Sequence, residues 1–381
     1  MSNTQKRWQL AARAGVLGVL MLLNSCSDPP VTIKTAQPES LGNPFLEKPV
    51  FARNVWDMQV FNGQLYFGHG DAVENSGPIK VFVYDPSSSQ FTSDFTVDDE
   101  AINSFNIIDN QLLIPGYDPR ESWDLGNFYR LENKVWHKYR TIPWGVHAYQ
   151  LLEFAGKLFI TIGTDDVHPG LLSSSDQGAT WVDMSGNQFN DRRFNKLIVL
   201  NSQLYATGLL ETGTVKLEGN LFKDASIPVA NIAPGVATDT PVVIQKLEYF
   251  NNGMVYTVGK RQMYTTDPAE ERFETKAKAA FFTTNFQDTV KIRLPENSVP
   301  TDILLRDGKV LILTHRKLEA GFENIVIESA DALNWKETLR FSSLSFARSF
   351  EFLEGKFYFG LGCYFTEQTC ESNGEVLRFV P

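Results

Sequence analysis

The chain lacks several of the features that mark common functional classes. It has only three cysteines and five histidines, and no long apolar run that could span a bilayer. It contains no phosphate-binding glycine loop, no nucleophile elbow and no His-Glu-x-x-His pair. Basic residues are also scarce, since 35 Lys and Arg stand against 45 Asp and Glu. The resulting net charge of −10 argues against nucleic acid or an anionic membrane surface as a partner.

The N-terminus has the pattern of an export signal. Three basic residues precede a short apolar run, Ala14 to Leu23, which is typical of a signal peptide. The run ends in Leu23-Asn24-Ser25-Cys26, which resembles the lipobox of bacterial lipoproteins. The resemblance implies that residues 1–25 are removed and that Cys26 receives lipid, palmitate included; the alternative is an ordinary cleaved signal with an incidental cysteine. Because Ser27 follows, we expect a lipid-anchored cell-envelope protein, with the outer membrane favoured.

The other two cysteines, Cys363 and Cys370, are separated by six residues. An oxidising compartment would let them close a small loop, so we expect a disulfide. The alternative is a metal-binding pair, but no histidine lies near enough in the sequence to complete such a site.

A polar, proline-bearing segment, residues 26–45, is predicted to be a tether, followed by one domain at residues 46–381. In this domain an alternating apolar strand, a tight Asn/Asp/Gly turn and a second strand recur. The turns fall at positions 63, 110, 156, 202, 253, 308 and 355. Tight hairpins need residues that tolerate positive φ, which explains the residue types at these turns.

The repeat length of 46 to 55 residues, with about four strands in each copy, predicts an all-β fold. We expect a seven-bladed β-propeller with four-stranded antiparallel blades; six or eight blades are the alternatives. The period of two excludes a helical solenoid. The last copy lacks a fourth strand, and residues 49–52 are predicted to supply it and so close the ring.

One repeat contains Ser174-Ser175-Asp176-Gln177-Gly178-Ala179-Thr180-Trp181, which matches the Asp-box pattern. The match resembles the repeats of sialidase-like, BNR-repeat propellers. That resemblance implies structural roles for Ser174, Asp176, Gly178 and Trp181, on the face away from the catalytic centre. Sialidase activity itself is not expected, because Phe51-Ala52-Arg53-Asn54 departs from the family's Phe-Arg-Ile-Pro motif.

Ionisable residues are concentrated in the loops that follow second strands and at the starts of inner strands. Convergent polar groups at the mouth of a propeller channel form the default ligand site; the alternative is that these loops are polar only because they are solvated. The ligand-binding candidates are His69, Asp71, Asp118, Arg120, Asp165, Asp166, His168, Arg193, Lys260, Arg261, His315, Arg316 and Arg348. Asn103, Tyr149 and Asn195 begin inner strands, and His147 lies nearby.

These observations predict an envelope module that binds a glycan or a protein. Two alternatives remain: a glycan-active hydrolase of sialidase-like fold, and a scaffold or assembly factor. We expect a monomer, attached to the membrane only through its lipid. No cofactor is expected, although carboxylates with histidine at the channel mouth would also suit a metal ion.

Overall fold

The computed structural model describes residues 34–35, 37–164, 170–186, 188–189, 192–263, 273–367 and 370–380. The chain divides into two units, Met1–Thr32 and Ile33–Pro381, and only the second contains described residues. The predicted signal peptide, Cys26 and the first part of the predicted tether lie outside the described residues, as do Asp165, Asp166 and His168. No helix in the described ranges has the length and apolar character needed to cross a membrane.

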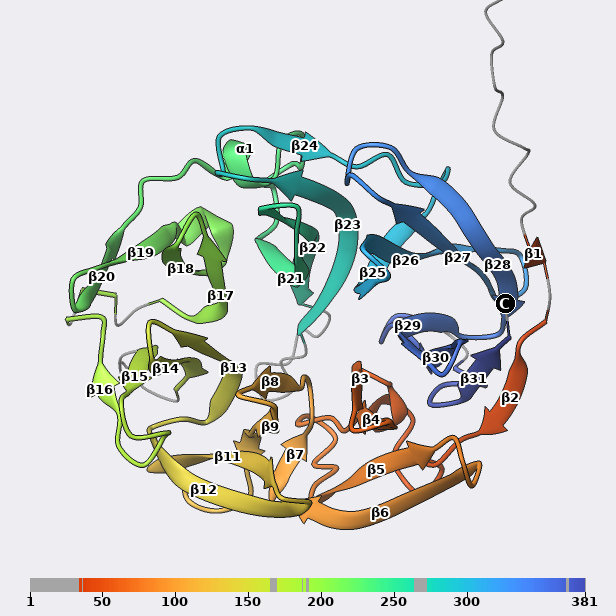
Figure 1. The fold of residues 1–381 in the computed structure, drawn as a ribbon, viewed down its shortest axis with the longest axis horizontal. Coiled ribbons are helices and arrows are strands. Elements are labelled where there is room, and N and C mark those ends of the chain that lie inside the picture. Colours follow the sequence, from red (N-terminus) through yellow and green to blue (C-terminus); the bar gives the residue numbers. More distant parts are fainter. Residues whose placement is uncertain are drawn as a thin grey trace, which may run out of the picture. The chain divides into compact units, whose positions relative to one another are not determined.

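Within the described residues, the strands form seven sheets arranged in a ring, which confirms the predicted seven-bladed propeller (Figure 1). Blade 1 contains β3 (Asp57–Phe61), β4 (Gln64–Gly68), β5 (Ile79–Asp85) and β6 (Gln90–Val97). Blade 2 contains β8 (Asn106–Ile108), β9 (Gln111–Pro115), β11 (Leu125–Glu132) and β12 (Val135–Pro143). Blade 3 contains β13 (His147–Phe154), β14 (Lys157–Gly163), β15 (Leu171–Ser174) and β16 (Val182–Asp183). Blade 4 contains β17 (Phe194–Leu200), β18 (Gln203–Gly208), β19 (Thr214–Glu218) and β20 (Leu221–Asp224).

The second half of the ring repeats the pattern. Blade 5 contains β21 (Val242–Phe250), β22 (Gly253–Met263), β23 (Phe273–Thr283) and β24 (Thr289–Lys291). Blade 6 contains β25 (Val299–Arg306), β26 (Lys309–Lys317), β27 (Phe322–Ser329) and β28 (Lys336–Ser343), with β1 (Lys34–Thr35) added as a parallel outer strand. Blade 7 contains β29 (Phe346–Leu353), β30 (Lys356–Gly362), β31 (Val376–Phe379) and β2 (Glu39–Gly42). Short helices are η1 (Phe51–Arg53), η2 (Leu210–Thr212) and α1 (Val229–Ile232).

The first two strands of every blade are joined by a two-residue turn in which both residues have positive φ. These turns are Asn62–Gly63, Asp109–Asn110, Ala155–Gly156, Asn201–Ser202, Asn251–Asn252, Asp307–Gly308 and Glu354–Gly355. Positive φ at both positions matches the right-handed twist of the flanking strands, so the repeated turn residues fix the hairpin register. In blade 5 the turn ends at Asn252, one residue earlier than predicted, and Gly253 begins β22.

The ring is closed by the two ends of the described chain, but not by the predicted segment. β2 pairs antiparallel with β31 as the outer strand of blade 7, beside it in Figure 1. The expectation that residues 49–52 form this strand is wrong, because Phe51–Arg53 forms η1 instead. The propeller therefore includes residues predicted to belong to the tether. The four residues of β2 carry a single apolar side chain, Leu41, and so show no alternating pattern in the sequence.

The core consists of apolar clusters between neighbouring blades. The cluster between blades 1 and 2, for example, contains Tyr66, Val81, Ile114 and Tyr129, all buried. Burying one such side chain stabilises the fold by roughly 1.5–3 kcal/mol. Because each blade shares a cluster with the next, the blades are fixed in order around the ring.

The predicted Asp-box forms the turn between β15 and β16. Ser174 Oγ donates to Asp176 Oδ1 at 2.7 Å and accepts the N–H of Gly178 at 2.8 Å. Trp181 packs edge-on against Phe128 of blade 2, with ring centroids 6.2 Å apart. Since successive strands alternate in direction, this turn lies at the same end of the propeller as the hairpin tips, opposite to the starts of the inner strands.

We expect removal of β2 to open the closed blade. A chain that begins at residue 43 should lose about 2 kcal/mol of unfolding free energy relative to one that begins at residue 37, because Leu41 no longer packs and the ion pair between Glu39 and Arg378 is lost. Both chains lack β1, so the difference reports on β2. Denaturant titration measures it, and equal midpoints for the two chains would contradict this account of closure.

Candidate functional site

Equivalent positions of all seven repeats meet at one end of the central channel. In each blade, count back seven residues from the second residue of the hairpin turn. The seven residues found in this way all line the same cavity, which has a volume of about 410 Å³. We call this set the upper ring; its members are Trp56, Asn103, Tyr149, Asn195, Gln245, Thr301 and Arg348. Its composition is polar and aromatic, as expected for the wall of a ligand site.

β-Bulges explain why these side chains face the channel. The inner strands of blades 3 to 7 each shift register where they pair with the second strand, and the skipped residues include the upper-ring residue every time. In β13, for example, the shift between Ala148 and Gln150 leaves Tyr149 outside the ladder. A bulge re-aims the extra side chain, so five strands place a residue in the cavity by the same device.

The loops of blades 1 to 3 form an additional ladder beside the cavity. β10 (Tyr117–Pro119) pairs with both β7 (Asp99–Ala101) and β13, and Gly70 bridges to Ala101. This ladder fixes Tyr117 on the wall between the first cavity and a second one of about 430 Å³. The two cavities share Tyr117, Tyr149, Asn195, Val243 and Thr275. They are therefore adjoining compartments of one site.

The walls of this site are rich in cations, although the chain as a whole is acidic. Among the described residues, the lining contains six cationic residues, Arg192, Arg193, Lys196, Lys246, Arg261 and Arg348, and two carboxylates, Asp71 and Glu274. Of the six, Lys246 is paired with Asp57 and Asp302. A site whose charge is opposite to that of the surrounding protein favours anionic ligands.

Directly below the upper ring, the next residue of each inner strand is polar in every blade. We call this set the middle ring; its members are Asp57, Ser104, Gln150, Lys196, Lys246, Asp302 and Ser349. Several of them bind the backbone of the neighbouring blade: Asp57 Oδ2 accepts the N–H of Phe105 at 2.8 Å, and Gln150 Oε1 accepts the N–H of Leu197 at 2.8 Å. The middle ring therefore joins blades as well as filling the channel.

Lys246 is the centre of an ion cluster in the middle ring. Its Nζ lies 2.6 Å from Asp57 Oδ1 and 3.5 Å from Asp302 Oδ1. Burial alone would lower the pKa of Lys246, but the charges of Asp302 and Asp57 outweigh it and raise that pKa. Burial raises the pKa of Asp302 to about 6, against the opposing effect of Lys246.

Two further carboxyl groups lie on the inner strands β21 and β29, two residues farther along the chain than the middle ring. Burial raises the pKa of Glu248 to about 7 and that of Glu351 to about 8, and the nearby charge of Asp302 adds to both shifts. The channel therefore contains carboxyl groups that are protonated near neutral pH.

Four of the ligand-binding residues predicted from the sequence line the site, namely Asp71, Arg193, Arg261 and Arg348. The predicted inner-strand residues Asn103, Tyr149 and Asn195 also line it. Arg348 is held in place by neighbours: its guanidinium lies over the ring of Trp56 at 4.4 Å, and Nη2 donates to the carbonyl of Cys363 at 2.8 Å. Arg193 is oriented by a hydrogen bond of 2.9 Å, which its Nη2 donates to the carbonyl of Thr164.

Two predicted histidines are packing residues away from the cavity. His69 is fully buried against Phe45, and burial lowers its pKa to about 4. His315 stacks on Phe346 with ring centroids 4.2 Å apart, and burial lowers its pKa to about 3. Both imidazoles are neutral at physiological pH and belong to the core.

The remaining predicted residues that the structure describes also lie off the cavity wall. Asp118 pairs with His147, with Oδ1 and Nδ1 3.2 Å apart. The other three form ion pairs with nearby carboxylates: Arg120 with Glu100, Lys260 with Asp239, and Arg316 with Glu323. These pairs account for their charges without a ligand.

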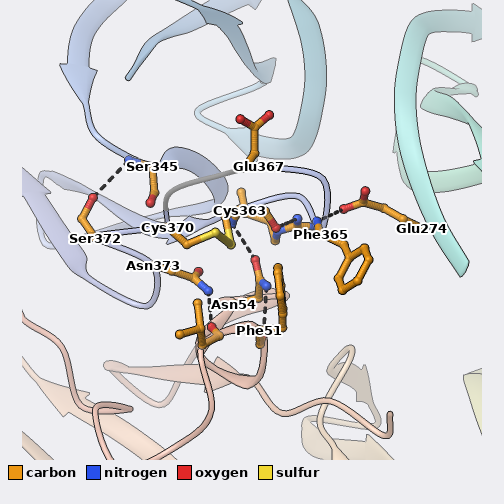
Figure 2. Close-up of a disulfide and its surroundings, with 12 residues drawn as sticks. Phe51, Asn54, Glu274, Ser345, Cys363, Phe365, Glu367, Cys370, Ser372 and Asn373 are labelled. Atoms are coloured by element: carbon orange, nitrogen blue, oxygen red, sulfur yellow. Dashed lines mark hydrogen bonds between the residues drawn. A yellow bond between two sulfur atoms is a disulfide. The ribbon is translucent and has the colours of Figure 1, made fainter. Parts of the chain in front are cut away.

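The predicted disulfide between Cys363 and Cys370 is present, with Cα atoms 5.7 Å apart. Figure 2 shows the disulfide and the neighbouring hydrogen bond in which the N–H of Phe365 donates to Glu274 Oε1, at 2.9 Å. The N–H of Cys363 donates to Asn54 Oδ1 at 2.8 Å. Since Asn54, Cys363, Phe365 and Glu274 all line the site, the disulfide fixes part of its wall.

A metal ion at the channel mouth was the alternative from the sequence, and three of its candidates, Asp165, Asp166 and His168, lie outside the described residues. In the ranges that the structure describes, no three His, Cys, Asp or Glu side chains are grouped so as to hold a metal ion.

The sequence analysis did not identify several of the lining residues, among them Trp56, Lys196, Gln245, Lys246 and Glu274. All but Glu274 belong to the upper or middle ring, so alignment of the seven turns would have identified them. Glu274 comes from the third strand of blade 5, and no repeated pattern marks its position.

No family model matches the chain, and no curated protein matches it. Solved structures do. A virginiamycin B lyase from Staphylococcus aureus is 10% identical over 91% of this chain and 99% of its own, with a TM-score of 0.54. A chain of a mitotic checkpoint complex is 9% identical over 97% and 99%, with a TM-score of 0.53. A polysaccharide lyase, a PL25 ulvan lyase, is 12% identical over 90% and 94%, with a TM-score of 0.47. The first two likenesses show the fold alone, and the resemblances to lipoproteins and to Asp-box proteins stay predictions.

We expect the raised pKa of Glu351 to make stability depend on pH. The unfolded carboxyl ionises near its ordinary pKa of 4.5, whereas the folded one retains its proton to about pH 8. The folded state therefore binds more protons in this window, and the free energy of unfolding falls as pH rises from 4.5 to 8. Glu351→Gln stays neutral and should exceed the parent by about 1–3 kcal/mol at pH 8, with a smaller difference at pH 5.

Denaturant titrations at several pH values measure this difference. Glu354→Gln is the matched control, because Glu354 is an exposed carboxylate three residues away on the hairpin turn. A pH-independent difference for Glu351→Gln, equal to that of the control, would show that Glu351 ionises normally.

A second expectation concerns the disulfide loop. Replacing both cysteines by serine should lower the free energy of unfolding by about 2–3 kcal/mol, the loop-closure value for a loop of this length. Reducing agent should lower the melting temperature of the parent to that of the double variant and leave the variant unchanged. A parent that is insensitive to full reduction, verified by thiol titration, would contradict a stabilising role.

Proposed function

We propose that the protein is a binding module for an acidic glycan, held in the cavity lined by the upper ring. The observation that carries this proposal is the excess of cations over carboxylates on the walls of the site, in a chain whose net charge is −10. Arginine and lysine favour carboxylate and sulfate groups through charge-assisted hydrogen bonds. The sugar units of the ligand would therefore carry such groups.

The uncharged part of the wall suits a sugar. Trp56, Tyr117 and Tyr149 supply aromatic surface, which packs against the apolar faces of pyranose rings.

The size of the site supports a short oligosaccharide. The two adjoining compartments measure about 410 and 430 Å³, within the range of pockets that enclose small organic ligands. With Cys26 lipidated, the domain would present this site in the cell envelope.

Arg193→Gln tests the proposal. Loss of one charge-assisted hydrogen bond, about 1.5–3 kcal/mol, should weaken binding of an acidic oligosaccharide roughly ten- to hundredfold. Arg316→Gln is the matched control, because Arg316 is an arginine whose ion pair with Glu323 lies off the cavity wall. A glycan array selects the ligand, and isothermal titration calorimetry then measures its affinity for each variant.

The control variant should bind as the parent does, and affinity should fall with added salt. Binding of neutral glycans only, or equal losses for the two arginine variants, would contradict an acidic-glycan site in this cavity.

A further inference from the structure

Lys196 differs from the rest of the middle ring. Asp57, Gln150, Asp302 and Ser349 bind the backbone of the neighbouring blade, and Ser104 Oγ donates to the carbonyl of Tyr149 at 3.4 Å. Lys246 has its two aspartate partners. The structure describes all seven of these residues, and among their side chains only that of Lys196 forms no hydrogen bond or ion pair.

The side chain of Lys196 is half-buried and lines the cavity. Burial lowers its pKa to about 8, and the positive charge of Lys246 lowers that pKa further while Asp57 opposes the shift. An ordinary lysine, with a pKa near 10.5, is almost fully protonated at pH 8, so the lowered pKa of Lys196 gives it a larger neutral fraction there.

The two channel lysines thus have different electrostatic environments. Lys246 is held as a cation by Asp57 and Asp302, and this fixed charge lies beside the unpaired Lys196. A desolvated lysine next to a second cation is the arrangement that activates an amine as a nucleophile. Within the described ranges, no hydrogen bond or ion pair of its side chain accounts for a lysine at position 196.

We propose that Lys196 is a nucleophilic amine that forms an imine with an aldehyde or ketone carrying an anionic group. The neutral amine nitrogen attacks the carbonyl carbon. The carbonyl oxygen then leaves as water, and its two protons replace, in the overall balance, the two N–H bonds that the amine loses. The product is a C=N bond, and nothing is oxidised or reduced. Arg193 and Arg348, on the same walls, supply positive charge for the anionic group.

This inference deepens the proposed function, because the open-chain form of a reducing sugar is an aldehyde. It rests on that function only for the identity of the natural carbonyl compound. The reactivity of the amine itself follows from the position of Lys196, and it can be tested with a carbonyl probe that is not a sugar.

The charged groups that the structure describes around Lys196 affect how the rate of imine formation depends on pH. Lys246 and Asp57 act on it directly. The same channel and cavity contain Asp302, Glu248, Glu351, Glu274 and Arg348. The carboxyl groups among them lose protons as pH rises and would favour the ammonium form, so the reaction should increase with pH more gradually than for an isolated amine.

The probe is pyridoxal 5′-phosphate, an aldehyde that carries a phosphate group. The folded protein is treated with less than one equivalent, the imine is reduced with borohydride, and modified peptides are quantified by mass spectrometry. Lys157 is the internal standard, because it is an exposed lysine at the opposite end of blade 3 from the cavity. We expect Lys196 to be modified at least tenfold more than Lys157 at pH 8, with half-maximal rate near pH 8.

Two variants test whether the modification occurs at Lys196 and depends on the charge of Lys246. Lys196→Arg keeps a cation and should abolish modification at this position without increasing it at Lys157. Lys246→Met should slow the modification of Lys196 and move its midpoint to higher pH, because it removes the neighbouring charge and leaves Asp57 and Asp302 to hold the ammonium. Thermal melts establish that each variant is folded; if Lys246→Met is not, the pH midpoint of the parent decides.

Modification of Lys196 no faster than that of Lys157, or a midpoint near pH 10, would overturn the inference. The acidic-glycan proposal fails separately, if Arg193→Gln binds acidic glycans as tightly as the parent. The two failures are distinguishable, because imine trapping is measured at Lys196 with a probe that is not a sugar, whereas glycan binding is measured with Arg193→Gln.

Discussion

Seven sheets around one axis must converge on that axis, and this geometric constraint determines the rest of the structure. Convergence brings the same position of every repeat to the same level of the channel. The upper ring and the middle ring are two consecutive levels, and the site is composed of them rather than of any single loop. The residues six and seven positions before the second residue of each hairpin turn are therefore channel residues, whatever their side chains.

The convergence of the blades also explains how a rigid backbone can present different side chains to the site. In blades 3 to 7 a bulge in the inner strand turns one residue into the cavity, while the following residue is free to bind the next blade or fill the channel. The middle ring consequently serves both stability and chemistry. Buried ion clusters such as Lys246 with Asp57 and Asp302 are weak sources of net stability, because desolvation offsets most of the attraction. Their more evident effect is to fix charges next to the cavity.

Much of the fold could be predicted from the sequence, because hairpin turns leave a local signal. Residues that tolerate positive φ recur at nearly constant spacing, and each confirmed turn fixes the register of its two inner strands. Closure could not be located, because β2 depends on pairing with β31, a partner more than 330 residues away, and its own residues show no pattern. The disulfide could be predicted because its partners are close in sequence and no third cysteine competes within the domain.

The candidate site was predicted only in part, and the reason is physical. Loop residues with ionisable side chains were chosen as candidates because such groups often bind ligands. In the structure, His69 and His315 pack against aromatic rings, and Arg120 and Arg316 are paired with carboxylates. Such partners come from distant segments and leave no local trace. The inner-strand positions were more reliable, because their direction follows from the turn and the bulge.

The central claim is that the levels at which equivalent repeat positions converge form the ligand site. The most direct measurement is a crystal structure of the protein with an oligosaccharide of uronic acids. The account predicts sugar rings against Tyr149 or Trp56, with a carboxylate within hydrogen-bonding distance of Arg193 or Arg348. An oligosaccharide bound at the Asp-box end of the propeller or on the outer strands, with only water in the cavity, would contradict it.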